Sequence, residues 1–296
     1  MQNKVYQVFT SKDLDGAASL LTVMWSKPQD TITYKEIAYY DTDIIKEYVQ
    51  KTHNPPNILI LDICLKENFI NDLDQENITF INHQSKTEKF VNQFKKAKLL
   101  FENYSSNCLF IRNLLKTKAP NLTDAQKKFI LLANDFESQE NKFEESYDLN
   151  IIFWTEFKND FSRFINFYKN GFVPLNNNQL KIVHTAKENA KNLLSKLKYY
   201  SGSLIIDGTP KKVLAVLSPS FNSIAIDFLM KKFDCDILFY INTESEKVSL
   251  RQRKTKDMID LVSFSQKYCD GDGHSYAAGG VITPLFMELT KKLNPL

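Results

Sequence analysis

The chain has 296 residues, enough for two ordinary domains, and its 43% hydrophobic and 25% charged content is that of an average globular protein. Its formal net charge of +3 is too small for a protein whose whole surface binds nucleic acid, so an anionic ligand would have to meet a local cluster. The four scattered cysteines form no C-x-x-C pair, which argues against both a zinc site and a disulfide framework.

The sequence also argues against a membrane location. No run approaches the roughly 18 apolar residues of a membrane-spanning helix. The opening segment MQNKVYQVFT lacks the basic, apolar and cleavage regions of a signal peptide. We therefore expect a cytoplasmic protein that keeps its cysteines reduced and has no membrane partner.

The N-terminal half alternates short apolar runs with amphipathic stretches. The pattern predicts strands over 5–9, 31–39, 57–63 and 78–82, and helices over 16–26, 43–51 and 122–134. Strands that alternate with helices indicate an α/β fold in which helices cover both faces of a parallel sheet.

The C-terminal half predicts a smaller α/β unit. Its expected elements are strands over 211–218, 236–242 and 247–253 and a helix near 221–232. Aromatic residues at helical spacing over 150–173 indicate packing rather than a platform for stacking bases. We predict a first domain over 1–175, a basic amphipathic linking helix over 176–200, and a second domain over 201–296.

Glycine is scarce in this chain and concentrated in one place. Only 8 glycines are present, and Gly271, Gly273, Gly279 and Gly280 fall within a single short segment. A sequence that otherwise avoids glycine uses it here for a backbone reason, such as a tight turn or close approach to a ligand. This segment is therefore a candidate binding site.

Acidic and histidine side chains follow the predicted strands. Asp13 and Asp15 come after the first strand, Asp62 and His83 end two later ones, and Asp135 ends a helix. Ligands of open parallel sheets bind beyond the carboxyl ends of the strands, where these side chains should meet. Each has an ordinary alternative, such as capping a helix for Asp13 and Asp15 or a structural role for His83. Together they favour a site, and the mutual repulsion of four carboxylates favours Mn²⁺ or Mg²⁺.

The same residues carry a resemblance to the DHH phosphoesterases that extends over essentially the whole chain. SKDLDGAAS resembles the D-x-D-G motif of that family, and LDI, INHQ and ANDFE are similar to its next three motifs in order. GDGHSYAAGG resembles the GGGHxxAAG signature of the family's C-terminal domain, and VSLRQR resembles the strand before that signature.

The resemblance implies an N-terminal Rossmann-like sheet domain that binds metal and a smaller C-terminal α/β domain that binds substrate. It implies two adjacent ions bridged by Asp62, and a catalytic role for Asp62, His83 and Gln84. The implied metal ligands are Asp13, Asp15, Asp62, His83 and Asp135, with Asp13 serving the second ion. The implied phosphate-binding residues are Ser249, Arg251, Arg253, Gly273 and His274.

The chain departs from the family pattern at four positions. Ser11 stands where the family has His or Asp, Asn82 replaces the Asp of Asp-His-His, Gln84 replaces its second His, and Asp272 replaces a glycine. A neutral hydroxyl is a poor metal ligand, and glutamine cannot donate a proton at neutral pH. These changes reduce the expectation from two ions to as few as one and leave catalysis in question.

The sequence therefore favours a metal-dependent phosphodiesterase that hydrolyses short oligonucleotides or cyclic dinucleotides to mononucleotides. The principal alternative is a catalytically weakened relative that binds a nucleotide to sequester or sense it. A pyrophosphatase or polyphosphatase and a nucleic-acid-binding module are further alternatives. α/β domains of this kind often pair, so a homodimer is also an expectation.

Overall fold

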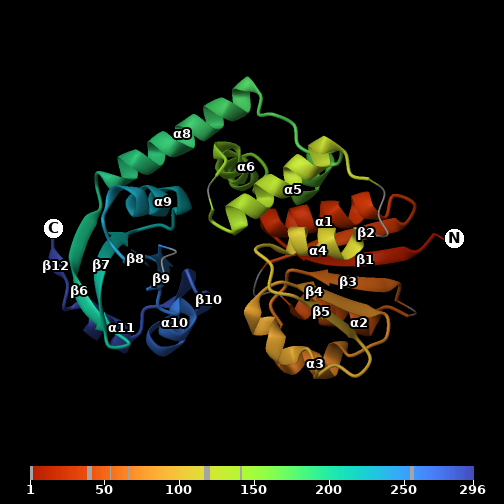
Figure 1. Cartoon of the computed structure of the whole chain (residues 1–296), viewed down its shortest axis with the longest axis horizontal. Helices are drawn as coiled ribbons and strands as arrows, with labels where there is room; N and C mark the ends of the chain where they lie inside the picture. Colours follow the sequence, from red (N-terminus) through yellow and green to blue (C-terminus); the bar gives the residue numbers. More distant parts are fainter. Residues whose placement is uncertain are drawn as a thin grey trace. The chain divides into compact units, whose positions relative to one another are not determined.

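The computed structural model describes residues 3–38, 42–53, 55–65, 67–116, 121–140, 142–253 and 257–296. The chain divides into two compact units, residues 1–183 and 184–296, and Figure 1 shows a separate sheet in each. No helix of the described segments is both long and apolar enough to cross a membrane.

The first unit is built on a five-stranded parallel sheet, as predicted. The strands lie in the order β2-β1-β3-β4-β5. They are β1 (Val5–Ser11), β2 (Thr31–Ile37), β3 (Asn57–Leu61), β4 (Ile78–Asn82) and β5 (Lys98–Phe101). The chain goes from β1 to β2 on one side and then returns to β3 on the other. The order therefore reverses at β1 and β3, where open α/β sheets bind ligands.

Helices cover both faces of this sheet (Figure 1). On one face, apolar side chains of α2 (Asp43–Lys51) and α3 (Glu67–Leu73) pack against β1, β3 and β4 in a single buried cluster. On the other lie α1 (Leu14–Ser26), α4 (Asn107–Leu115) and α5 (Asp124–Glu137). The 3₁₀ helix η1 (Ser85–Phe90) follows β4.

The strand predicted over 31–39 ends at Ile37 in the structure. Residue 39, the last of the predicted range, lies outside the described segments.

The aromatic segment forms two helices rather than one, α6 (Glu144–Thr155) and α7 (Phe161–Tyr168). The Phe164 ring is fully buried, and its centroid lies 4.9 Å from that of Phe153, 5.3 Å from that of Phe157 and 4.8 Å from that of Tyr168. The interpretation of these aromatic residues as packing is confirmed.

The second unit contains a seven-stranded mixed sheet in the order β10-β11-β9-β8-β7-β6-β12. Its strands are β6 (Lys198–Ile206), β7 (Thr209–Ser218), β8 (Ile237–Asn242), β9 (Lys247–Gln252), β10 (Asp272–His274), β11 (Ala277–Val281) and β12 (Asn294–Pro295). Among the described strands of this second sheet, only β7 and β8 pair in parallel, and α9 (Ser223–Lys232) connects them. On one face of this sheet, α9 packs together with the C-terminal end of α8 (Asn177–Leu194). On the other face lie α10 (Leu261–Cys269) and α11 (Pro284–Thr290).

The predicted linking helix is too long at its C-terminal end. The helix ends at Leu194, and residues 198–200 already belong to β6, where they pair with β7. The basic sequence pattern predicts one amphipathic helix, but residues 198–200 pair with β7, whose backbone supplies hydrogen-bond partners that favour a strand.

We expect Phe164→Ala to lower the free energy of unfolding of the first unit by about 3–5 kcal/mol, because it removes a fully buried ring and leaves a cavity. Urea unfolding followed by tryptophan fluorescence would measure this, since both tryptophans, Trp25 and Trp154, lie in that unit. Phe167→Ala is the matched control, because Phe167 is 38% exposed. Equal losses for the two variants would contradict the assignment of Phe164 to the core.

Candidate metal centre

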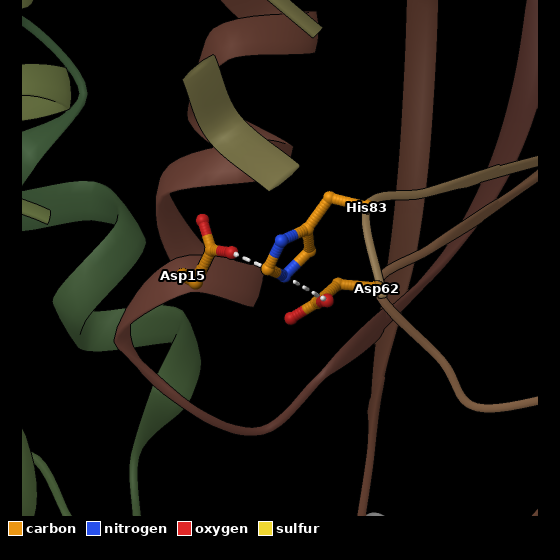
Figure 2. A group of neighbouring side chains, drawn as sticks. All are labelled: Asp15, Asp62 and His83. Atoms are coloured by element: carbon orange, nitrogen blue, oxygen red, sulfur yellow. Dashed lines mark ion pairs between the residues drawn. The ribbon is translucent and has the colours of Figure 1, made fainter. Parts of the chain in front are cut away.

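Three buried side chains meet at the point where the strand order reverses. Asp15 lies in the first turn of α1 after β1, Asp62 follows β3 and His83 follows β4. Figure 2 shows the imidazole of His83 between the two carboxylates, with Nε2 3.6 Å from Asp15 Oδ2 and 3.4 Å from Asp62 Oδ1. One ligand atom of each residue lies within 4.8 Å of the other two. The predicted convergence of these three residues is observed.

The N-terminus of α4 holds Asp15 in place. The backbone N–H of Asn107 donates to Asp15 Oδ2 at 2.7 Å, and that of Cys108 donates to Oδ1 at 3.0 Å. Ser106 caps the same helix by accepting a hydrogen bond from Leu109 N. The positive end of a helix dipole stabilises an anion, so α4 fixes the position of this carboxylate and favours its ionised form.

Asp62 has an unusual backbone conformation. Its φ angle is +55°, in the left-handed region that Asp and Asn tolerate better than most residues but that still costs free energy. Its N–H donates to Ile81 O on β4 at 3.0 Å, which ties the turn to the neighbouring strand. Of its two carboxylate oxygens, Oδ1 is buried and accepts no hydrogen bond from the described part of the chain. A cation is a suitable partner for such an oxygen.

The orientation of His83 presents Nε2 toward the carboxylates. Its Nδ1 lies 3.0 Å from the carbonyl oxygen of Tyr104, so this nitrogen donates its proton there. A metal bound here would displace the Nε2 proton and leave a neutral ring with its lone pair on Nε2, as in most metal-binding histidines. Burial lowers the pKa of His83, but the hydrogen bond and charge of Asp62 and the charge of Asp15 outweigh it and raise the pKa to about 10.

The electrostatics of the cluster favour a cation. Burial and the charge of Asp62 raise the pKa of Asp15 to about 6 and that of Asp13 to about 7. Carboxylates that share a buried site resist ionisation unless a positive charge joins them. The donor set of two carboxylates and one imidazole fits a divalent ion such as Mn²⁺ or Mg²⁺, and Asp62 Oδ1 is already available to it.

Asp13 lies beside this group but is used as a helix cap. Its Oδ1 accepts hydrogen bonds from Gly16 N at 2.7 Å and from the Ser11 hydroxyl at 2.9 Å. The same hydroxyl lies 2.9 Å from Asp62 Oδ2. A Cβ atom on Gly16 would lie 2.1 Å from the Ser11 carbonyl oxygen, which explains the glycine at this position.

The structure does not bring Asp135 into the cluster. Its Oδ1 accepts a hydrogen bond from Lys142 N at 2.9 Å, and its Oδ2 accepts from Phe143 N at 3.2 Å and from Ser146 Oγ at 2.6 Å. The carboxylate thus fixes the connection between α5 and α6. The group that could hold a metal among the described residues comprises Asp15, Asp62 and His83 without it.

Glu137 is the carboxylate that sequence reasoning missed. Burial and the charges of Asp15, Asp13 and Asp62 raise its pKa well above the usual range, which places it near the cluster. Residues two positions apart along an α-helix differ by about 200° of rotation, so the side chains of residues 135 and 137 lie on nearly opposite sides of α5 and face different neighbours. Asn134, one turn before Glu137, accepts hydrogen bonds from Ser105 and Ser106 Oγ at the N-terminus of α4. This helical phase is the signal that would have identified Glu137.

The two substituted residues of the third motif occupy well-defined positions. Asn82 Oδ1 accepts a hydrogen bond from Gln84 N at 2.7 Å, and its Nδ2 donates to Ile63 O at 3.0 Å. An aspartate could make only the first contact, so asparagine stabilises both loops that carry Asp62 and His83. Gln84 is half-buried at the start of η1.

In the second unit, the predicted phosphate-binding residues lie on β9 and the β10–β11 hairpin. Ser249 and Arg251 share one face of β9, and an Arg251 Nη1 hydrogen donates to Ser249 Oγ at 2.9 Å. Arg253 instead donates to the carbonyls of Met230 and Phe233, at the C-terminal end of α9. His274 lies on β10, and its side chain is outside the described part of the structure.

The clustered glycines have a packing reason within their own hairpin. A Cβ on Gly271 would lie 2.0 Å from Gly279 O, one on Gly273 2.4 Å from Ala277 O, and one on Gly280 2.2 Å from Cys269 O. Gly273 also has a φ angle of +152°. The sequence pattern therefore marks close backbone packing of β10, β11 and α10.

No family model matches the sequence, and no curated protein matches it. Solved structures do match. The pGpG-specific phosphodiesterase PggH from Vibrio cholerae is 11% identical, with 97% of this chain and 96% of that chain covered and a TM-score of 0.56. The chain has the DHH phosphoesterase fold.

Two further structures share this DHH fold. RecJ from Thermus thermophilus in complex with Mn²⁺ is 10% identical over 98% of this chain and 51% of that chain, with a TM-score of 0.57. An exopolyphosphatase-related protein from Bacteroides fragilis is 13% identical over 98% of this chain and 92% of that chain, with a TM-score of 0.53. The DHH resemblance predicted from the sequence is thus confirmed for the fold.

We expect Asp62→Asn to lower Mn²⁺ affinity at least tenfold, because it removes the negative charge while retaining a residue that tolerates the backbone. Calorimetric titration of the EDTA-treated protein would measure this. A hundredfold excess of Mn²⁺ over Kd should stabilise the unmutated protein by about 2.7 kcal/mol. Unchanged affinity in the variant would show that Asp62 is not a ligand.

We expect Asp135→Asn to lower the stability of the protein rather than its affinity for Mn²⁺. Its amide nitrogen would meet backbone donors at the start of α6, so we expect a loss of about 1–3 kcal/mol in the free energy of unfolding. Mn²⁺ affinity should change less than threefold. A loss of affinity as large as that of Asp62→Asn, without loss of stability, would return Asp135 to the metal site.

Proposed function

We propose that this chain is a metal-dependent phosphoesterase that hydrolyses the phosphodiester bond of short oligonucleotides or of linear or cyclic dinucleotides. The observation that carries the proposal is the buried Asp15–Asp62–His83 group at the reversal point of a DHH-fold sheet. A divalent ion bound there supplies Lewis-acid activation of water and neutralises charge on the phosphate.

The residues of the chain then have separate tasks. Asp15, fixed by the amides of α4, and Asp62, fixed by its turn, would hold the ion. His83 completes the set because its Nδ1 proton is held by the Tyr104 carbonyl. Asp15 and His83 are oriented by backbone groups and Asp62 by the Ser11 hydroxyl before any ligand arrives, which reduces the reorganisation needed for catalysis.

Gln84 and Glu137 are proposed to act around this group. Gln84 follows His83 directly, and its amide can donate a hydrogen bond to a phosphate oxygen without transferring a proton. Glu137 adds an acidic side chain whose pKa is raised by burial and by the charges of Asp15, Asp13 and Asp62, and we propose that it hydrogen-bonds a water molecule near the ion. Leaving-group protonation would then fall to solvent.

Substrate binding is assigned to the second unit. Arg251 offers a planar, permanently charged donor fork for a phosphate, and Ser249 adjoins it on β9. Gly273 and His274 lie on the hairpin that pairs with the same strand through β11. Arg253 is the weakest of the predicted residues, since it caps the end of α9.

The nature of the similar structures supports a nucleotide substrate and manganese. One is a pGpG-specific phosphodiesterase, and RecJ structures contain Mn²⁺. At identities of 10–11% these names describe those proteins, so substrate and metal are proposals for this chain. A cytoplasmic location and a homodimer likewise stay predictions.

The decisive experiment is turnover on a panel of linear dinucleotides, cyclic dinucleotides and oligomers of two to five nucleotides with Mn²⁺. We expect release of mononucleotide that EDTA abolishes and that Asp62→Asn lowers by at least a factor of one thousand. Asp74→Asn is the matched control, because Asp74 is a surface aspartate that accepts backbone hydrogen bonds from residues 95–97. A panel without any turnover would contradict the proposal.

Arg251→Gln should raise KM for the same substrate at least tenfold with a smaller effect on kcat, because it removes the charge that binds phosphate but none of the reacting groups. Steady-state kinetics would measure the split. Arg163→Gln, at an exposed arginine paired with Glu156 in the first unit, is the control. A fall in kcat alone would contradict the assignment of Arg251 to substrate binding.

A second candidate function is nucleotide binding without efficient hydrolysis. The observations that favour it are the Ser11 hydroxyl on Asp62 Oδ2 and the glutamine at position 84. Calorimetry with the same nucleotide panel would distinguish it. Tight binding without product would favour this function, and hydrolysis would favour the enzyme.

A further inference from the structure

The position of Ser11 determines how many ions the buried cluster can hold. Ser11 is the last residue of β1 and is only 3% exposed. Its hydroxyl lies 2.9 Å from Asp13 Oδ1 and 2.9 Å from Asp62 Oδ2. A second ion on the Asp13 side would need oxygens of these same two carboxylates, and the hydroxyl already contacts one oxygen of each.

The Asp13 oxygen that contacts Ser11 already has a second hydrogen-bond donor. Oδ1 accepts from Gly16 N at 2.7 Å as well as from Ser11, so this one oxygen serves the N-cap of α1 and the hydroxyl together. Releasing it to a metal would leave the first turn of a buried helix without its cap, which destabilises the helix. Asp13 is therefore engaged in structure.

The two oxygens of Asp62 face different neighbours. Oδ2 contacts the Ser11 hydroxyl, whereas the buried Oδ1 lies 3.4 Å from His83 Nε2. An ion bound by Asp15, Asp62 and His83 uses the Oδ1 side and leaves the Ser11 contact intact. A bridging role would require the Oδ2 side as well.

The absence of a side chain at Gly16 leaves the room that the Ser11 hydroxyl occupies, because a Cβ atom there would lie 2.3 Å from the hydroxyl oxygen. The hydroxyl is uncharged, so it also brings no negative charge to attract a second cation. The local geometry and the local charge both favour a single ion.

We propose that this chain binds one divalent ion, at Asp15, Asp62 and His83, and that the Ser11 hydroxyl takes the place of a second ion by linking Asp13 to Asp62. The inference deepens the proposed function and rests on it for the choice of metal. It differs from the two-ion arrangement that the resemblance implies.

The test is the metal content of the full-length protein. After Mn²⁺ loading and gel filtration, elemental analysis should give one Mn per chain, and electron paramagnetic resonance should show isolated Mn²⁺ without the splitting of a coupled pair. Two ions per chain with a coupled spectrum would overturn the inference, and so would a chain that retains no ion.

Ser11→Asp provides the complementary variant. It adds a charged ligand beside Asp13 and Asp62, so bound Mn should rise from one to two per chain with appearance of the coupled spectrum. Ser11→Ala removes the hydroxyl without adding a ligand and should still hold one. A folded Ser11→Asp variant that stays at one ion would overturn the role of Ser11 in excluding the second ion.

These readouts are independent of turnover. One bound ion without hydrolysis would contradict the proposed enzyme but leave this inference standing. Hydrolysis by a protein with two ions would do the reverse. If Ser11→Asp fails to fold, the elemental analysis and spectrum of the unmutated protein still decide the question.

Discussion

The candidate site depends on the reversal of strand order in the parallel sheet of the first unit. Because β2 and β3 lie on opposite sides of β1, the connections that leave β1 and β3 diverge above and below the sheet. The space between them receives the residues that follow the strands, Asp15, Asp62 and His83. Three hydrogen bonds with backbone groups orient the side chains of Asp15 and His83, and a fourth, from Asp62 N to Ile81 O, holds the turn that carries Asp62. The fold thereby provides the free energy needed to bring like charges together.

The part of the site that follows the strands could be predicted from the sequence alone. The carboxyl ends of parallel strands share one edge of a sheet, so Asp62 and His83 had to be neighbours once β3 and β4 were recognised. Asp15 followed from the short link between β1 and α1. For these residues, chain connectivity and strand direction determine position without any detail of packing.

The direction of the acidic side chains on α5 could not be predicted in the same way. Asp135 was chosen because ANDFE resembles a family motif, but the direction of a side chain on α5 depends on the phase of that helix against its neighbours. The rotation of α5 about its axis is held by Asn134, which lies on α5 and accepts a hydrogen bond from Ser106 at the N-terminus of α4. This contact joins segments that are distant in the sequence. The start of β6 was missed for a related reason, since pairing with β7 outweighed a local helical pattern.

The glycine signature illustrates a difference between locating a feature and explaining it. The concentration of glycine correctly marked an unusual backbone, but Gly271 and Gly280 are constrained by atoms of their own hairpin and of α10. Residues that permit close packing and residues that admit a ligand share the same sequence pattern. Only the identity of the nearest atom distinguishes them.

The left-handed backbone of Asp62 has an evolutionary consequence. Asparagine and glycine are the residues that adopt this conformation at least cost, and each is one base change away from aspartate. Either replacement would remove the carboxylate while preserving the turn between β3 and α3. A lineage of this protein could therefore lose the proposed metal ligand in a single step without losing its shape, and the identity of this one residue would report which descendants keep the carboxylate.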